Sequence, residues 1–170
     1  AIKEYYSINV KRESGYNLNL ITDSTYSELH KEINTLSQIK TEGIIDIYDS
    51  IETNGTAYLI MEYLEGITLK NYVKKNGKIT EKYGKELFDK LTKSLYYLHK
   101  NNKIIHKDIT PNNIMILKDG SMRIIDFGLS SKYNKNEVNI INKEENFLTP
   151  NYAPLEQYNN ESVGEYTDVY

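Results

Sequence analysis

The chain contains no cysteine and no tryptophan, and only three of its 170 residues are proline. Without cysteine it can form neither disulfides nor thiolate metal sites, which excludes disulfide-stabilised folds and zinc–cysteine sites. No hydrophobic run approaches the roughly 20 residues that a membrane-spanning helix needs, and no signal peptide is recognisable. We therefore expect a cytoplasmic segment, which leaves open a membrane anchor elsewhere in the protein.

Positive charge is also limited. The chain carries 21 Lys and Arg residues against 24 Asp and Glu residues, a formal net charge of −3, which argues against nucleic-acid binding. Only three histidines are present. His30 and His99 are expected on polar helix faces, so no zinc site is predicted. At this length we expect one domain with a hydrophobic core.

What the chain does contain is a dense run of polar residues between positions 104 and 128. The segment reads IIHKDITPNNIMI, then a short turn, then RIIDFG. Asn113 and Asp126 carry the oxygen donors that Mg²⁺ prefers, and Asp108 is placed to accept a proton from an attacking hydroxyl. Taken singly, each of these residues is more often an ordinary turn or cap residue. Together, their spacing favours metal-assisted phosphoryl transfer.

The residues around this run predict a β-hairpin. Residues 114–117 are a short apolar run typical of a strand, and Asp119-Gly120 is a turn signal. Residues 122–125 are expected to form the returning strand. Such a hairpin would place Asn113 at its entry and Asp126 at its exit. Both side chains would then lie at the same end and converge on one metal site.

These motifs resemble the catalytic loop and metal-binding loop of the protein kinase family, whose template is H-R-D-x-x-x-x-N followed by D-F-G. Here Lys107 stands in the Arg position, and residues 126–128 match fully. Residues 149–158 read TPNYAPLEQY, which resembles the end of the activation segment in bacterial-type Ser/Thr kinases. The resemblance implies an α+β, two-lobed kinase fold that transfers the ATP γ-phosphate to a Ser or Thr hydroxyl of a protein substrate.

The resemblance also implies roles for single residues. Asp108 would handle the substrate hydroxyl, and Asn113 and Asp126 would hold Mg²⁺, with Mn²⁺ as the alternative metal. Lys3, in a segment similar to V-A-I-K, would anchor the ATP phosphates, and Glu32 would orient Lys3 through an ion pair. Without the downstream motifs, Lys3 would be read as an exposed terminal lysine. The residues expected to bind the nucleotide are Lys3, Met61, Glu62, Leu64, Met115 and Asp126.

The activation segment and the residues after it carry further expectations. By resemblance, Thr149 would lie near the catalytic Asp, and Asp168 would hydrogen-bond the backbone of the catalytic loop. Ser130, Ser131 and Thr149 are the candidate autophosphorylation sites, because phosphorylation often controls the order of this segment.

The chain departs from the family pattern at three places. No Gly-rich phosphate loop precedes Lys3, and the chain ends at Tyr170. We therefore expect a partial kinase domain, with residues 1–63 from the small lobe without its first strands, 64–68 as the hinge, and 69–170 from a truncated large lobe. Such a fragment is expected to be impaired alone. Thr110 stands where many kinases place a phosphate-steadying Lys; it would serve catalysis as a hydrogen-bond donor without a charge.

Two other functions fit parts of the pattern. A catalytically weak or inactive pseudokinase that binds ATP as a scaffold is favoured by the expected truncation and by Thr110, while the intact Lys3, Asp108, Asn113 and Asp126 weigh against it. A small-molecule kinase on the same fold would also carry a catalytic and a metal-binding Asp. Such enzymes generally lack a segment like residues 149–156, which this chain has.

The hydrophobic pattern predicts the remaining elements. Strands are expected from Lys3 to Tyr6, over residues 44–51 and over 56–63. An amphipathic helix is expected to carry Glu32, and a short helix spans residues 69–75. Thr80 should cap a long helix that ends at Asn101-Asn102. The core stripe of that helix is expected to consist of Leu87, Leu91, Leu95 and Leu98.

Overall fold

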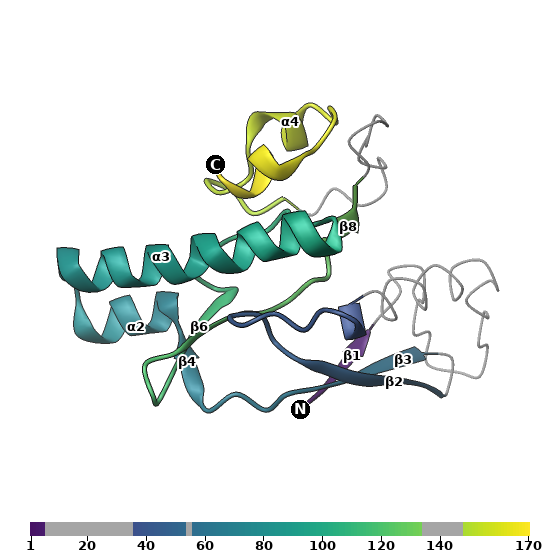
Figure 1. The fold of residues 1–170 in the computed structure, drawn as a ribbon, viewed down its shortest axis with the longest axis horizontal. Helices are drawn as coiled ribbons and strands as arrows, with labels where there is room; N and C mark the ends of the chain where they lie inside the picture. Colours follow the sequence, from purple (N-terminus) through teal and green to yellow (C-terminus); the bar gives the residue numbers. More distant parts are fainter. Residues whose placement is uncertain (6–35, 54–55, 134–147) are drawn as a thin grey trace, which may run out of the picture. The chain divides into compact units, whose positions relative to one another are not determined.

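The computed structural model describes residues 1–5, 36–53, 56–133 and 148–170. These residues form two compact units, one from residues 1–40 and 45–64 and the other from residues 41–44 and 65–170. Both units mix strands with helical segments or turns (Figure 1). The helix expected around Glu32 and most of the activation loop lie outside the described residues.

The first unit contains a three-stranded antiparallel sheet. Strands β1 (Ile2–Tyr5), β2 (Ile47–Thr53) and β3 (Thr56–Met61) are ordered β1-β3-β2. β3 is therefore the central strand, with Lys3 opposite Leu59 on one side and Ser50 opposite Leu59 on the other. Leu59 is buried, as expected for a central strand.

A strand is expected over residues 44–51, and the predicted start of that strand is wrong. β2 begins at Ile47, while Ile44 forms an isolated parallel bridge with Ile124 in the second unit. Gly43 turns the chain here with φ +83°, and the Ile44 amide donates to the Thr41 carbonyl at 3.1 Å. This left-handed turn, which glycine adopts readily, interrupts the extended conformation before Ile47.

The second unit contains most of the helical residues. The long helix α3 (Glu81–Tyr97) begins at Thr80, whose Oγ1 accepts from the Tyr83 amide at 3.3 Å, as expected for an N-cap. It continues into a π-helical turn, η1 (Leu98–Asn102). Of its expected core stripe, Leu87, Leu95 and Leu98 are buried and Leu91 is half-buried.

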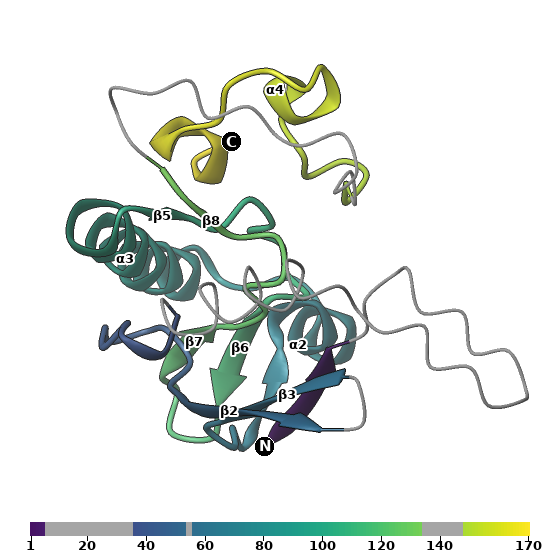
Figure 2. The same cartoon turned by 90° about the vertical axis from the view of Figure 1, so that its right-hand side faces the viewer.

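A second sheet contains the predicted hairpin. Strands β4 (Gly66–Thr68), β6 (Ile114–Leu117) and β7 (Met122–Ile124) are antiparallel and ordered β4-β6-β7. The short helix α2 (Leu69–Asn76) contacts β4 and β6, while α3 contacts β7, and both helices lie beside this sheet in Figure 2. Every second side chain of the hairpin is buried, namely Ile114, Ile116, Met122 and Ile124. This alternation places one face of the hairpin in the core of the unit.

The remaining elements of the second unit are short. Strands β5 (Ile104–Ile105) and β8 (Ser131–Lys132) pair with each other. Helix α4 (Leu155–Tyr158) lies at the end of the activation segment, and helix η3 (Glu165–Asp168) follows it. In Figure 1 these C-terminal helices lie on the opposite side of α3 from α2. The most fully buried side chains of this unit are Leu98, Ile104, Ile105, His106, Thr110 and Ile124.

Candidate active site

Asp108 lies on the loop between β5 and β6, where both of its carboxylate oxygens accept hydrogen bonds. The Thr149 hydroxyl donates to Oδ1 at 2.7 Å, and the Asn113 side-chain amide donates to Oδ2 at 2.6 Å. The same amide nitrogen also donates to the Asp108 main-chain carbonyl at 3.0 Å. The expected proximity of Thr149 to Asp108 is confirmed, although the two residues are 41 positions apart.

Asn113 and Asp126 lie together at one end of the hairpin, as the turn signal predicted. The Ile125 amide donates to the Asn113 carbonyl at 2.8 Å, so the entry and exit of the hairpin are hydrogen-bonded to each other. Both hydrogen bonds of the Asn113 side chain use its nitrogen, which leaves its amide oxygen as the atom able to face a cation. The exposed Asp126 accepts from the Gly128 amide at 3.3 Å.

Two residues of this site adopt a backbone conformation that L-residues rarely occupy. Lys107 has φ +66° and Asp126 has φ +62°. Each conformation costs about 1–3 kcal/mol in general and persists only where the surroundings enforce it. At Lys107, the enforcing contacts are hydrogen bonds from its amide to Asp168 at 2.7 Å and from Gln157 to its carbonyl at 3.1 Å.

Asp168 anchors the catalytic loop to the C-terminal segment. Its carboxylate accepts from the amides of His106 at 2.8 Å and Lys107 at 2.7 Å, which confirms the contact that the resemblance implied. It also contacts the His99 ring, with Nε2 at 2.7 Å from Oδ2. The expectation that His99 lies on a polar helix face is wrong. It is 5% exposed, because η1 turns it inward beneath the catalytic loop.

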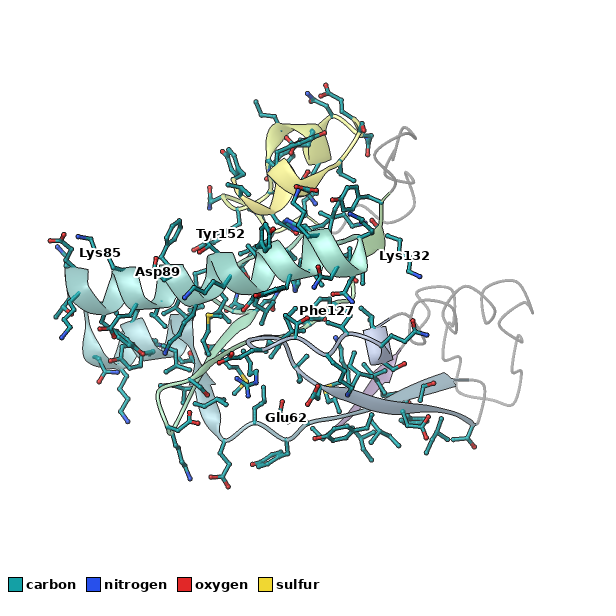
Figure 3. The ribbon with its side chains drawn as sticks, viewed as in Figure 1. Glu62, Lys85, Asp89, Phe127, Lys132 and Tyr152 are labelled. Atoms are coloured by element: carbon teal, nitrogen blue, oxygen red, sulfur yellow. The ribbon has the colours of Figure 1, made fainter. Side chains whose placement is uncertain are left out.

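His106 is fully buried and is held as a neutral ring. Its Nδ1 accepts from the Asp108 amide at 3.3 Å, so the proton resides on Nε2, which faces the Ile125 carbonyl at 3.2 Å. Burial lowers the pKa of His106, because the imidazolium form would lose its hydration, and the nearby Asp168 charge opposes that shift only in part. The ring of Phe127, labelled in Figure 3, packs against it with centroids 4.7 Å apart.

Three hydroxyl residues of this region differ in their surroundings. Thr110 is 1% exposed, and within the described part of the chain its hydroxyl has no hydrogen-bond partner. Ser130 is buried and donates to the Phe127 carbonyl at 2.7 Å, whereas Ser131 is half-buried on β8. A buried, bonded hydroxyl such as that of Ser130 is the least accessible of the expected phosphorylation sites.

Most of the residues that are expected to bind the nucleotide belong to the first unit. Lys3 is half-buried on β1, Met61 ends β3, and Glu62 and Leu64 follow it. The Glu62 amide already donates to the Asp46 carbonyl at 2.8 Å, so only the Glu62 carbonyl remains for an adenine. Met115 is half-buried on β6 in the second unit. Glu32 lies outside the described residues.

The donor chemistry of the hairpin end fits a magnesium ion. An Asp carboxylate and an Asn carbonyl are oxygen ligands, and Mg²⁺ usually takes one or two carboxylates together with waters and phosphate oxygens. No group of three or more His, Cys, Asp or Glu side chains forms a metal cage within the residues that the structure describes. An ion held by Asn113 and Asp126 would take its remaining ligands from waters and phosphate oxygens.

Sequence comparison places these features in a known family. The family model for the protein kinase domain matches residues 11–170, a range that includes the catalytic loop and hairpin but begins after Lys3.

Among the described residues, no helix is long and apolar enough to cross a membrane.

Curated relatives include bacterial and animal kinases. A probable serine/threonine-protein kinase of Clostridium acetobutylicum is 33% identical over 126 residues, 72% of this chain and 19% of that protein. The serine/threonine-protein kinase PrkC of Bacillus subtilis is 30% identical over 126 residues, with the same coverage. Sperm motility kinase 3A of Mus musculus is 40% identical over 101 residues, 59% of this chain and 20% of that protein.

The chain spans about a fifth of the length of these curated relatives. The family match, in contrast, extends over nearly all of the chain, and it covers the hairpin whose geometry is described above. The chain therefore belongs to the protein kinase domain family and has its α+β fold.

Proposed function

We propose that this chain carries the catalytic loop of a Ser/Thr protein kinase that transfers the ATP γ-phosphate to a protein hydroxyl. The observation that supports this most directly is the hydrogen bond from the Thr149 hydroxyl to Asp108 Oδ1 at 2.7 Å. Here a threonine hydroxyl donates to this carboxylate, which is the kind of contact that an acceptor hydroxyl is proposed to make.

In the proposed reaction, Asp108 orients the acceptor hydroxyl and takes its proton. The acceptor oxygen bonds to the γ-phosphorus while the bond from that phosphorus to the β–γ bridging oxygen breaks, and ADP leaves with the electron pair. The Asn113 amide supports Asp108 by donating to Oδ2, which leaves Oδ1 for the hydroxyl. For a substrate to enter, Thr149 must share or release Oδ1.

The Asn113 oxygen and Asp126 are proposed to hold Mg²⁺, or Mn²⁺ as the alternative. The bound ion supplies positive charge against the phosphate oxygens. Lys3 is proposed to anchor the phosphates and Glu32 to orient Lys3. Thr110 would offer a hydroxyl near the transferred group. The nucleotide base is proposed to contact Met61, the Glu62 carbonyl, the Leu64 amide and Met115.

Specificity for Ser and Thr, rather than Tyr, is supported by two observations. The bacterial relatives are described as serine/threonine-protein kinases, and the segment from Thr149 to Glu156 resembles the Ser/Thr form of the activation segment. Ser131 and Thr149 are the better candidates for autophosphorylation, since the Ser130 hydroxyl is buried and bonded. A cytoplasmic location and impairment of this chain in isolation remain predictions.

A pseudokinase that binds ATP without turnover is the second candidate, and Thr110 is the residue that favours it. A buried hydroxyl there supplies no charge to the γ-phosphate. The Asp108–Thr149 contact favours the active enzyme over this alternative.

The test is an autophosphorylation assay with Mg·ATP on the full-length protein and on this chain. Asp108→Asn is expected to lower the rate by about 10²–10⁴-fold, because a general base is lost, while nucleotide binding persists. Asp126→Ala is expected to abolish labelling. Asp89→Asn on the exposed side of α3, labelled in Figure 3, is the matched control and should label normally. If the wild-type full-length protein binds nucleotide but shows no labelling, the pseudokinase is established instead.

A further inference from the structure

The short helix α2 begins directly beside the catalytic loop. The Lys70 amide donates to the Pro111 carbonyl at 2.9 Å, and Pro111 lies between Asp108 and Asn113 in the loop. Immediately before α2, β4 pairs with β6, with Thr68 opposite Met115. The start of α2 is therefore fixed to the loop that would receive the acceptor hydroxyl.

This helix and the turn after it are strongly basic. Residues 69–80 hold four lysines and no acidic residue, although the formal net charge of the whole chain is −3. The side chains of these four lysines are exposed, and none has an acidic partner among the described residues. We call them the α2 lysines; they are Lys70, Lys74, Lys75 and Lys78.

Two other exposed lysines of the same unit do have acidic partners. Lys85 pairs with Glu81 at 2.8 Å on α3, and Lys118 pairs with Glu65 at 2.7 Å. Lys85 and Asp89, labelled in Figure 3, also show that charges of both signs alternate along α3. An ordinary solvated face has this mixed character, which α2 lacks.

Helix stability accounts for some of the α2 lysines but not for Lys70. Lys74 and Lys75 occupy the last turn, where cations interact favourably with the negative end of the helix dipole. Lys70 occupies the first turn, where a cation is unfavourable and where no acidic residue compensates it. Lys70 and Lys74 are one turn apart and share a face, so together they form a positive strip that starts at the catalytic loop.

Between Asp108 and this strip the exposed loop surface carries no charged side chain. Asn112, next to Pro111, is exposed and uncharged. A peptide that extended from Asp108 toward α2 would meet this uncharged amide and then the lysines at positions 70 and 74.

We propose that the α2 lysines, with Lys70 and Lys74 foremost, select protein substrates that carry Asp or Glu residues beside the acceptor Ser or Thr. This proposal rests on the proposed kinase function and adds the substrate class to it. Since the lysines are exposed, their contribution is screened by salt and acts on substrate choice rather than on the chemical step.

The experiment compares three peptides with one central Ser or Thr, flanked on both sides by Glu, by Ala or by Lys, as substrates of the full-length protein. The wild type is expected to give a kcat/KM about tenfold higher for the Glu peptide than for the Ala peptide, and lowest for the Lys peptide. The double variant K70E/K74E is expected to lose this preference and to favour the Lys peptide. Its rate on the Ala peptide should stay within about twofold of the wild type.

The matched control is K82E/K93E, which reverses two exposed lysines of α3 and should keep the wild-type preference. Raising the salt concentration to about 1 M should shrink the preference of the wild type. Equal kcat/KM values for the three peptides, or an unchanged preference in K70E/K74E, would overturn this proposal alone. Absence of labelling of every peptide and of the protein itself would instead overturn the proposed kinase function, and this proposal with it.

Discussion

At the scale of single residues, the site depends on two carboxylates with different tasks. Asp108 accepts from Thr149 and Asn113 on its two oxygens, which orients it toward an incoming hydroxyl. Asp168 accepts from the amides of His106 and Lys107, so it holds the loop in a left-handed conformation that Lys107 would not adopt alone. Asp108 is therefore oriented toward the substrate hydroxyl, and Asp168 holds the loop that carries Asp108 in position.

His106 gives the folded state a dependence on pH. Its pKa is lowered in the folded protein from about 6.5 in the unfolded chain, so below pH 6.5 the unfolded chain binds more protons. The contribution of His106 to stability is therefore complete above about pH 6.5 and is lost as the pH falls toward the folded pKa, at up to about 1.4 kcal/mol per pH unit. Urea unfolding between pH 7.5 and 5.5 should show this loss.

An NMR titration of the histidine side chains tests the same prediction without a substitution. The His106 resonance is expected to stay at its neutral position through pH 6.5 and to move only at lower pH. A midpoint at or above 6.5 would contradict the assignment of a neutral, buried ring.

At the scale of elements, local sequence signals predicted an element correctly where it depends only on residues close together in the chain. The Asp119-Gly120 turn, the Thr80 cap and the leucine stripe of α3 all lie where their patterns placed them. The segment around Gly43 did not follow its pattern, because its apolar run of isoleucines is divided between the two units. Ile44 pairs with Ile124, while Ile47 begins β2.

Gly43→Ala is expected to destabilise the second unit by about 2–3 kcal/mol. The φ of +83° is unfavourable for Ala, and the added Cβ would lie 2.0 Å from Ser94 Oγ. Ser94 would have to move away and lose its hydrogen bond to the Glu42 carbonyl at 3.0 Å. Urea unfolding of the wild type and the variant measures this loss.

Gly120→Ala is the matched control for the backbone contribution. Gly120 has φ +80°, but nothing lies within 4 Å of an added Cβ. It should therefore cost only the strain of a positive φ, about 1 kcal/mol. Equal losses in the two variants would mean that the contact with Ser94 is unimportant.

At the scale of the whole molecule, the residues proposed to bind Mg·ATP are distributed over the two compact units. Lys3, Met61, Glu62 and Leu64 belong to the first unit, whereas Asp108, Asn113 and Asp126 belong to the second.

Mg·ATP is expected to raise the thermal midpoint of the protein. A ligand at 100 times its Kd adds about 2.7 kcal/mol, which corresponds to roughly 5–10 °C for a domain of this size. ATP with EDTA should raise the midpoint less, and Asp126→Ala should remove the metal-dependent part of the increase. An equal increase with and without Mg²⁺ would contradict the metal roles proposed for Asn113 and Asp126.

The sequence by itself determined the hairpin, the cap of α3 and the clustering of Asn113 with Asp126, because each depends on residues close together in the chain. Resemblance to kinases added Thr149 and Asp168, which lie 41 and more than 60 residues from their partners in the loop. Only the tertiary structure decided that His99 is buried against Asp168 and that Ile44 belongs to the second unit. It also decided that α2 begins beside the catalytic loop, where the Lys70 amide bonds to Pro111. These contacts depend on how distant segments pack, and local hydrophobic periodicity carries no information about that packing.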